Sequence, residues 1–139
     1  MKVILDTNVL LGALISPYGP PDKIYHAWCD GQFDLVTSEE QLDELRRVSR
    51  YPKLKTILPA HRIGTLINHM QRSIVLDSFM ALPSGIQIND PNDIFLVSMA
   101  LSAEADYLVT GDCRAGLLAI GHIGRTRILS PACFCEEIL

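Results

Sequence analysis

The chain has 139 residues, of which 48% are hydrophobic and 20% are charged, and its formal net charge is −4 at pH 7. This length fits one ordinary domain, expected over residues 1–139, and the composition excludes a disordered chain and a surface that attracts nucleic acid as a whole. The sequence lacks the apolar run of about 18 residues that a membrane span needs and the apolar core of a signal peptide, so we expect a cytosolic protein with no membrane contact.

Short β-branched runs alternate along the chain with segments whose apolar residues recur at helical spacing. The runs are KVILD (2–6), FDLVT (33–37), IQI (86–88), DYLVT (106–110) and TRILS (126–130). This alternation predicts right-handed βαβ units, and therefore a three-layer α/β/α sandwich around a parallel sheet of about five strands. Segments SPYGPP (16–21), RYPKLKTILP (50–59) and ALPSG (81–85) are expected to be loops.

Two helix starts are legible in the sequence. Ser38, followed three residues later by Gln41, forms a capping-box pattern that predicts a helix from about Glu39 to Arg50. Asp90 before Pro91 is an N-cap with proline at the first helical position, and it predicts a helix over residues 91–105. Because that segment is apolar nearly all round, we expect this second helix to be buried.

Acidic residues recur where predicted strands end or helices begin. Asp6 ends the first strand, Asp93 lies in the first turn of the helix after Asp90, and Asp112 follows DYLVT through Thr110 and Gly111. In open parallel sheets, ligands bind outside the carboxyl ends of the strands. The sequence therefore predicts that Asp6, Asp93 and Asp112 share one edge of the sheet.

A fourth acid is expected on the helix that begins at Glu39. Leu42, Leu45 and Val48 define its buried stripe, and Glu44 is the acid nearest the edge of that stripe, with Glu39 close behind. Glu40 and Asp43 are expected to point toward solvent. Glu44 is thus the acid of this helix that can reach over the rim of the sheet.

Four carboxylates at one rim would repel one another, so a positive charge is expected between them. No lysine or histidine lies within the three loop motifs, and the simplest source of that charge is a bound cation. Carboxylate oxygens alone suit Mg²⁺ or Mn²⁺ better than zinc, and such a site commonly activates water for attack on phosphorus. This pattern favours phosphodiester hydrolysis, although Asp90 and Asp93, taken singly, are also typical helix caps.

Five quoted segments together resemble the PIN-domain family, and most closely the bacterial VapC-like toxin components of toxin–antitoxin pairs. They are ILDTNVLLGAL (4–14), TSEEQLDELRRV (37–48), RYPKL (50–54), DPNDIFLVSMALSAEADYLVTGD (90–112) and RILSP (127–131). The order and distances of DTNVL, the mid-chain glutamate, DPND and VTGD are specific, and the resemblance covers essentially the whole chain.

The resemblance implies a Mg²⁺- or Mn²⁺-dependent ribonuclease acting on RNA, in which Asp6, Glu44, Asp93 and Asp112 are both the metal ligands and the catalytic residues. It further implies supporting roles for Asn8 and Thr110, a less secure one for Asp90, a protein antitoxin as partner, and a homodimer. A nuclease of general RNA processing is the alternative. Apart from the resemblance, the hydroxyl of Thr7 and the amide of Asn8 are expected to start the first helix and orient it.

A basic cluster follows Glu44 and would lie beside the metal site. Six of the twelve lysines and arginines fall within residues 46–62: Arg46, Arg47, Arg50, Lys53, Lys55 and Arg62. The first five are candidates for binding RNA phosphates, and a solvated helix face and loop is an equally good interpretation.

Other patterns leave alternatives open. A haloacid-dehalogenase-like phosphatase would need an acid where Asn8 stands, and a receiver-type signalling module would carry a lysine after a late strand where Asp112 stands. Segments AWCDGQF (27–33) and TLINHMQRSIVL (65–76) fit an interface or a layer over the sheet equally well. The four cysteines show no zinc-site spacing and are expected to be reduced.

Overall fold

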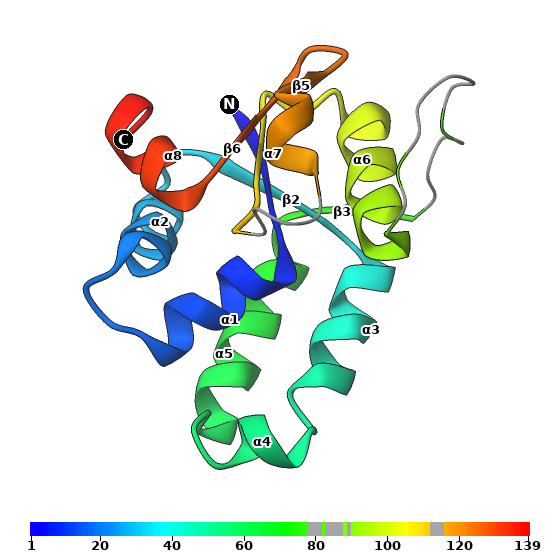
Figure 1. Cartoon of the computed structure of the whole chain (residues 1–139). Coiled ribbons are helices and arrows are strands. Elements are labelled where there is room, and N and C mark those ends of the chain that lie inside the picture. Colours follow the sequence, from blue (N-terminus) through cyan, green and yellow to red (C-terminus); the bar gives the residue numbers. More distant parts are fainter. Residues whose placement is uncertain (78–81, 83–87, 89, 112–115) are drawn as a thin grey trace.

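Six strands form one sheet in the described part of the chain, with β1 between β2 and β4 in the order β3-β2-β1-β4-β6-β5 (Figure 1). The structure is a computed structural model, and it describes residues 1–77, 82, 88, 90–111 and 116–139. The strands are β1 (Lys2–Leu5), β2 (Asp34–Ser38), β3 (Ile74–Leu76), β4 (Tyr107–Val109), β5 (His122–Ile123) and β6 (Thr126–Leu129). All neighbouring pairs are parallel except β5 and β6.

The predicted parallel sheet is confirmed, but the expected set of strands is corrected in two places. The third strand is β3, a short edge strand that follows a helix and lies inside the segment 65–76, which was expected to line an interface or to cover the sheet. The expected strand IQI falls on residues 86 and 87, outside the described residues, and on Ile88, which is not in a strand. The sixth strand, β5, is a two-residue antiparallel partner of β6, too short to show periodicity.

Helices cover both faces of the sheet, which confirms the three-layer sandwich (Figure 1). Side chains alternate along β1, so that Val3 and Leu5 pack into one core and Ile4 into the other. The first core receives buried residues from α1 (Thr7–Ile15), α2 (Pro20–Cys29), α3 (Glu39–Val48), α5 (Ala60–Gln71) and α8 (Pro131–Glu137). The second receives them from α6 (Pro91–Ala103) and α7 (Leu117–Ile120).

Both predicted helix caps are present. The Ser38 hydroxyl accepts a hydrogen bond from the Gln41 backbone N–H at 3.1 Å, and the Asp90 carboxylate accepts one from the Asn92 N–H at 2.9 Å. Helix α3 ends at Val48, two residues earlier than expected, and α6 ends at Ala103 because Glu104 adopts a left-handed conformation at φ 51°. Helices also occur in two segments expected to be loops: α2 begins at Pro20, and α4 spans Pro52–Lys55.

The two apolar segments considered for an interface, 27–33 and 65–76, bury most of their large apolar side chains in the chain's own core. Trp28, Phe33, Leu66 and Met70 are all at most 5% exposed and belong to the first core. Their interpretation as a layer over the sheet is therefore favoured. In the described ranges, no helix is long and apolar enough to cross a membrane.

Candidate active site

The candidate site lies where the order of strands along the chain reverses. The chain moves outward from β1 to β2 and β3, then returns to place β4 on the other side of β1. The crevice beyond the carboxyl ends of two such strands is the usual ligand position in an open α/β sheet. Asp6 follows β1 and Thr110 follows β4, so the fold delivers both residues to this crevice.

Asp6 is held by groups from three directions. Its backbone N–H donates to the Val109 carbonyl of β4 at 2.9 Å, and its Oδ2 accepts the Thr110 hydroxyl at 2.9 Å. Its Oδ1 accepts the backbone N–H of Asn8 at 3.4 Å, which makes Asp6 the N-cap of α1. Asn8 therefore supports Asp6 through its backbone N–H, and Asn8 itself is exposed.

Glu44 reaches the same crevice from α3. It is half-buried, whereas Glu39, Glu40 and Asp43 on the same helix are exposed. Burial raises the pKa of Glu44, and the negative charge of Asp6 and, more weakly, that of Asp90 raise it further. The Arg47 guanidinium and a hydrogen bond from Thr7 lower the same pKa. Asp6, Glu44 and Asp90 are thus electrostatic neighbours.

The other two predicted acids are Asp93 and Asp112. Asp93 lies in the first turn of α6 and is 3% exposed, and its backbone N–H donates to the Asp90 carbonyl at 3.0 Å. Asp112 lies outside the described residues. The structure therefore brings together Asp6, Glu44, Asp90 and Thr110, and it places Asp93 one helical turn beyond Asp90.

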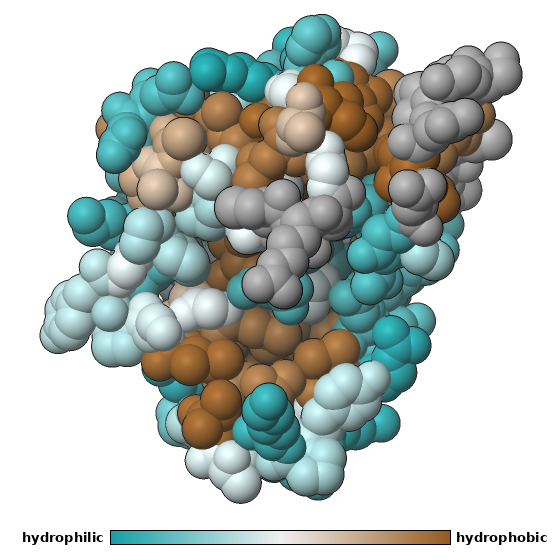
Figure 2. All heavy atoms as spheres, viewed as in Figure 1, coloured by the Kyte–Doolittle hydropathy of each residue, from teal (hydrophilic) through white to brown (hydrophobic). Residues whose placement is uncertain are grey.

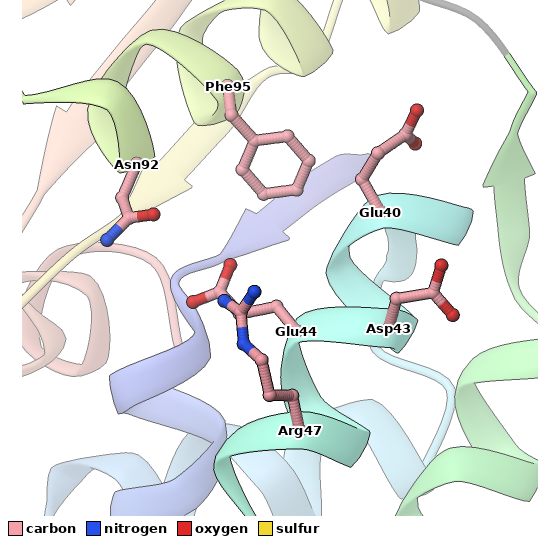
Figure 3. Close-up of a pocket in the computed structure, with 6 residues that line it drawn as sticks. All are labelled: Glu40, Asp43, Glu44, Arg47, Asn92 and Phe95. Atoms are coloured by element: carbon pink, nitrogen blue, oxygen red, sulfur yellow. The ribbon is translucent and has the colours of Figure 1, made fainter.

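A hollow of about 400 Å³ adjoins Glu44 between α3 and α6. Figure 3 shows the Glu44 carboxylate beside the Arg47 guanidinium, next to the junction of β1 and α1, with Asn92 and Phe95 facing them from α6. Glu40 and Asp43 line its outer side. The hollow offers a cation, an amide and an aromatic ring beside the acidic groups.

The basic cluster after Glu44 divides into engaged and exposed side chains. Arg46 pairs with Asp43 at 3.1 Å, and Arg62 donates to the Leu14 carbonyl at 2.9 Å. Arg50, Lys53 and Lys55 are exposed, and no ion pair of theirs is present within the described residues. These three are therefore better placed than Arg46 to contact an external anion.

Gln41, Thr37 and Thr7 belong to the site although the sequence interpretation did not select Gln41 or Thr37 for it. The Gln41 side chain is 1% exposed and donates to the Leu5 carbonyl at 2.7 Å, directly before Asp6. The Thr37 hydroxyl donates to Gln41 at 2.8 Å. One signal was available: Gln41 stands four residues before Leu45 and so falls on the buried stripe of α3, where a polar side chain needs a partner.

The donor atoms of this crevice suit a hard cation. Asp6, Glu44 and Asp90 offer carboxylate oxygens, and their mutual repulsion would be relieved by a positive ion. Among the described residues, no group of three or more His, Cys, Asp and Glu is gathered closely enough to hold a metal. Mg²⁺ is commonly held by one or two carboxylates while keeping several waters, so Asp6 and Glu44 fit such an ion.

Replacing Glu44 by Gln in metal-free protein is expected to leave the melting temperature at pH 7 unchanged or to raise it by a degree or two, on the order of a few tenths of a kcal/mol. Folding raises the pKa of Glu44, so the folded state binds more protons between the unfolded and folded pKa values, and stability falls as pH rises through that window. The amide lacks this penalty.

Thermal melts with a chelator, at pH 7 and at about pH 4 where unfolded carboxyls begin to protonate, test this sign. The advantage of Glu44→Gln should shrink at the lower pH. Glu40→Gln is the matched control, because Glu40 is an exposed acid of the same helix. The difference in melting temperature between Glu40→Gln and wild type should not shrink at the lower pH. A Glu44→Gln protein that is less stable at pH 7 than at pH 4, relative to wild type, would contradict the argument.

Known proteins resemble this chain in sequence and in fold. A family model described as PIN domain matches residues 2–114. The fold is similar to that in the crystal structure of VapBC2 from Rickettsia felis bound to a DNA fragment from their promoter, with a TM-score of 0.58 and 18% identity over 94% of this chain and 98% of that chain. None of the curated proteins compared with the sequence matches it. PIN domains are generally nucleases, and because the family model covers most of the sequence, the chain belongs to the PIN-domain family.

Proposed function

We propose that the protein is a Mg²⁺- or Mn²⁺-dependent endoribonuclease that hydrolyses phosphodiester bonds of single-stranded RNA. The observation that carries the proposal is the convergence of the Asp6 and Glu44 carboxylates beyond the carboxyl end of β1. Membership of a family of nucleases that generally use divalent metals supports it. A phosphatase would need an acid where Asn8 stands, and a receiver-type module would need a lysine where Asp112 stands.

Asp6 and Glu44 would hold the cation, and Asp93 and Asp112 would complete the acidic set. When bound, the cation lowers the pKa of a water and offsets charge on the departing oxygen. The Thr110 hydroxyl fixes the rotamer of Asp6, and Thr7 donates to Glu44, so neither carboxylate has to reorganise when the ion arrives. In the reaction, a water oxygen bonds to phosphorus, the P–O ester bond breaks, and the departing oxygen gains a proton.

The substrate would enter through the hollow between α3 and α6. Arg47 beside Glu44 can pair with a phosphate, since a guanidinium matches phosphate oxygens in geometry and charge. Asn92 offers an amide for a base edge or a sugar hydroxyl. Phe95 presents a ring against which an unstacked base can lie, and such stacking is available in single-stranded RNA and not in a duplex.

We also propose that this nuclease is the toxin of a toxin–antitoxin pair and that it forms a homodimer. The likeness of its fold to a VapBC2 chain supports this assignment over general RNA processing. Apolar residues reach the surface near α1 and α5 in Figure 2, and large exposed apolar side chains include Ile15 at the end of α1 and Ile57 before α5. These residues, and not the buried side chains of Trp28, Phe33, Leu66 and Met70, are available to a partner.

Purified protein is expected to cleave labelled single-stranded RNA only when Mg²⁺ or Mn²⁺ is supplied, and to leave para-nitrophenyl phosphate and acetyl phosphate unchanged. Each substrate is incubated with metal and with chelator, and the products are separated on a denaturing gel or read by absorbance. Release of phosphate from para-nitrophenyl phosphate would favour a phosphatase, and a phosphorylated protein after acetyl phosphate would favour a receiver module.

A further inference from the structure

Gln41 is a buried polar side chain that links the two carboxylates without touching either. It stands one turn before Glu44 on α3 and is 1% exposed. Its Nε2 donates to the Leu5 carbonyl at 2.7 Å and lies 3.5 Å from the Thr7 hydroxyl oxygen. Its Oε1 accepts the Thr37 hydroxyl at 2.8 Å. One side chain therefore joins β1, the start of α1, the end of β2 and α3.

The orientation of the Gln41 amide follows from the chemistry of its partners. The Leu5 carbonyl can only accept a hydrogen bond, so the NH₂ group must face it. Oε1 then faces Thr37, whose hydroxyl must donate. No other orientation satisfies both buried partners, and a glutamate at this position could not donate to Leu5 while ionised.

The peptide unit between Leu5 and Asp6 is hydrogen-bonded at both its carbonyl and its N–H. Its carbonyl, on Leu5, accepts from Gln41, and its N–H, on Asp6, donates to the Val109 carbonyl at 2.9 Å. Because the peptide unit is planar, bonds at its two ends fix the orientation of the plane. The direction in which the Asp6 side chain leaves the backbone is thus set by α3 on one side and β4 on the other.

The second link runs through Thr7 to Glu44. The Thr7 hydroxyl oxygen receives the Gln41 N–H, while its own hydrogen is donated to the Glu44 carboxylate. A hydroxyl has one hydrogen, so accepting from Gln41 favours the rotamer that points this hydrogen toward Glu44. Thr7 is itself 3% exposed, so its hydroxyl is shielded from solvent.

We infer that Gln41 is a positioning residue that fixes the Asp6 and Glu44 carboxylates relative to each other. The inference rests on the proposed function in one respect, that these two carboxylates bind the same metal ion. Residues that orient metal ligands typically change metal affinity by about 10- to 100-fold when replaced. Gln41 would act indirectly, through the Leu5 carbonyl and the Thr7 hydroxyl.

The test compares Gln41→Leu with Thr126→Val. Thr126 is 1% exposed and donates a buried hydrogen bond to the Ala105 carbonyl at 2.6 Å, and it lies on β6 at a distance from the carboxyl end of β1, so it matches the loss of a buried bond without touching the site. Both variants are expected to melt earlier than wild type. Only Gln41→Leu should weaken Mn²⁺ binding, by about 10-fold or more in isothermal titration.

A second pair of measurements covers a Gln41→Leu protein that fails to fold. Thr37→Val removes only the bond to Gln41 Oε1 and should weaken Mn²⁺ binding in the same direction by a smaller factor, on the order of threefold. In metal-free protein, the ¹⁵N–¹H signal of the Asp6 amide should shift in Gln41→Leu and Thr37→Val and stay in place in Thr126→Val.

The outcomes separate this inference from the proposed function. If wild type binds Mn²⁺ and cleaves RNA while Gln41→Leu keeps the Mn²⁺ affinity of Thr126→Val, the inference is overturned and the nuclease stands. If wild type neither binds nor cleaves, the proposed function is overturned, and a shifted Asp6 amide signal still supports the positioning role of Gln41. An unshifted signal in both Gln41→Leu and Thr37→Val overturns that role.

Discussion

Replacing Asp6 by Asn is expected to lower kcat/KM for RNA cleavage by about a thousandfold or more, since losing a metal ligand removes several kcal/mol of transition-state stabilisation and each 1.4 kcal/mol is about tenfold in rate. The fold should persist. Asparagine also caps helices well, and its carbonyl oxygen can accept the Thr110 hydroxyl that Asp6 now accepts at 2.9 Å. Cleavage of labelled RNA under single-turnover conditions measures the loss, and a thermal melt checks the fold.

The control for Asp6→Asn is Asp34→Asn. Asp34 is an exposed aspartate at the amino end of β2, the strand next to β1, so its replacement changes net charge equally at the opposite edge of the sheet. Its cleavage rate should stay within about twofold of wild type, as is usual for surface substitutions. Equal activity of Asp6→Asn and Asp34→Asn would exclude Asp6 from the chemistry and leave it a helix cap.

The edge of the sheet that bears the site was predictable from the sequence because parallel strands place their carboxyl ends together. Asp6 and Thr110 each follow a β-branched run that predicts a strand. The two residues therefore lie close together if the two strands are neighbours, as β1 and β4 are. Glu44 required one more step, the helical stripe through Leu42 and Leu45, and its half-buried state agrees with that step. Whether these acids bind metal stays a prediction.

The hydrogen bonds of Gln41 that support the two carboxylates were not predictable in the same way. The capping-box pattern predicted Gln41 only in part. Its backbone N–H does donate to Ser38, but its side chain turns inward to the Leu5 carbonyl, where the pattern would have it bond back to the Ser38 N–H. That choice depends on the distance between α3 and β1, which is a property of packing. The strands β3 and β5 were missed for a related reason, because they are recognised by their pairing with β2 and β6 and not by an alternating pattern of their own.

Reversing the charge of Arg50 and Lys55 together is expected to weaken RNA binding by about 10- to 100-fold at low salt while leaving kcat unchanged. Both side chains are exposed, and together with Ser49 they line a hollow of about 460 Å³ between the end of α3 and the start of α5. Arg50 follows the carboxyl end of α3, the helix that carries Glu44, and Lys55 ends α4, the next helix (Figure 1). The phosphates that flank a bond cleaved at Glu44 would therefore meet these two side chains.

Salt dependence distinguishes phosphate contacts at Arg50 and Lys55 from a general charge effect. For single strands, each phosphate contact contributes about 0.7 to the slope of log affinity against log salt, so Arg50→Glu with Lys55→Glu should lower the slope's magnitude by about 1.4. Lys23→Glu with Arg72→Glu changes the net charge equally on exposed residues of α2 and of the turn before β3, and it should leave the slope near that of wild type. Since the protein carries a net charge of −4, an effect confined to the first pair would show that RNA is held by a local basic surface. Equal slopes for the two double variants, measured by fluorescence anisotropy from 50 to about 200 mM salt, would instead assign Arg50 and Lys55 to a solvated face with no part in binding.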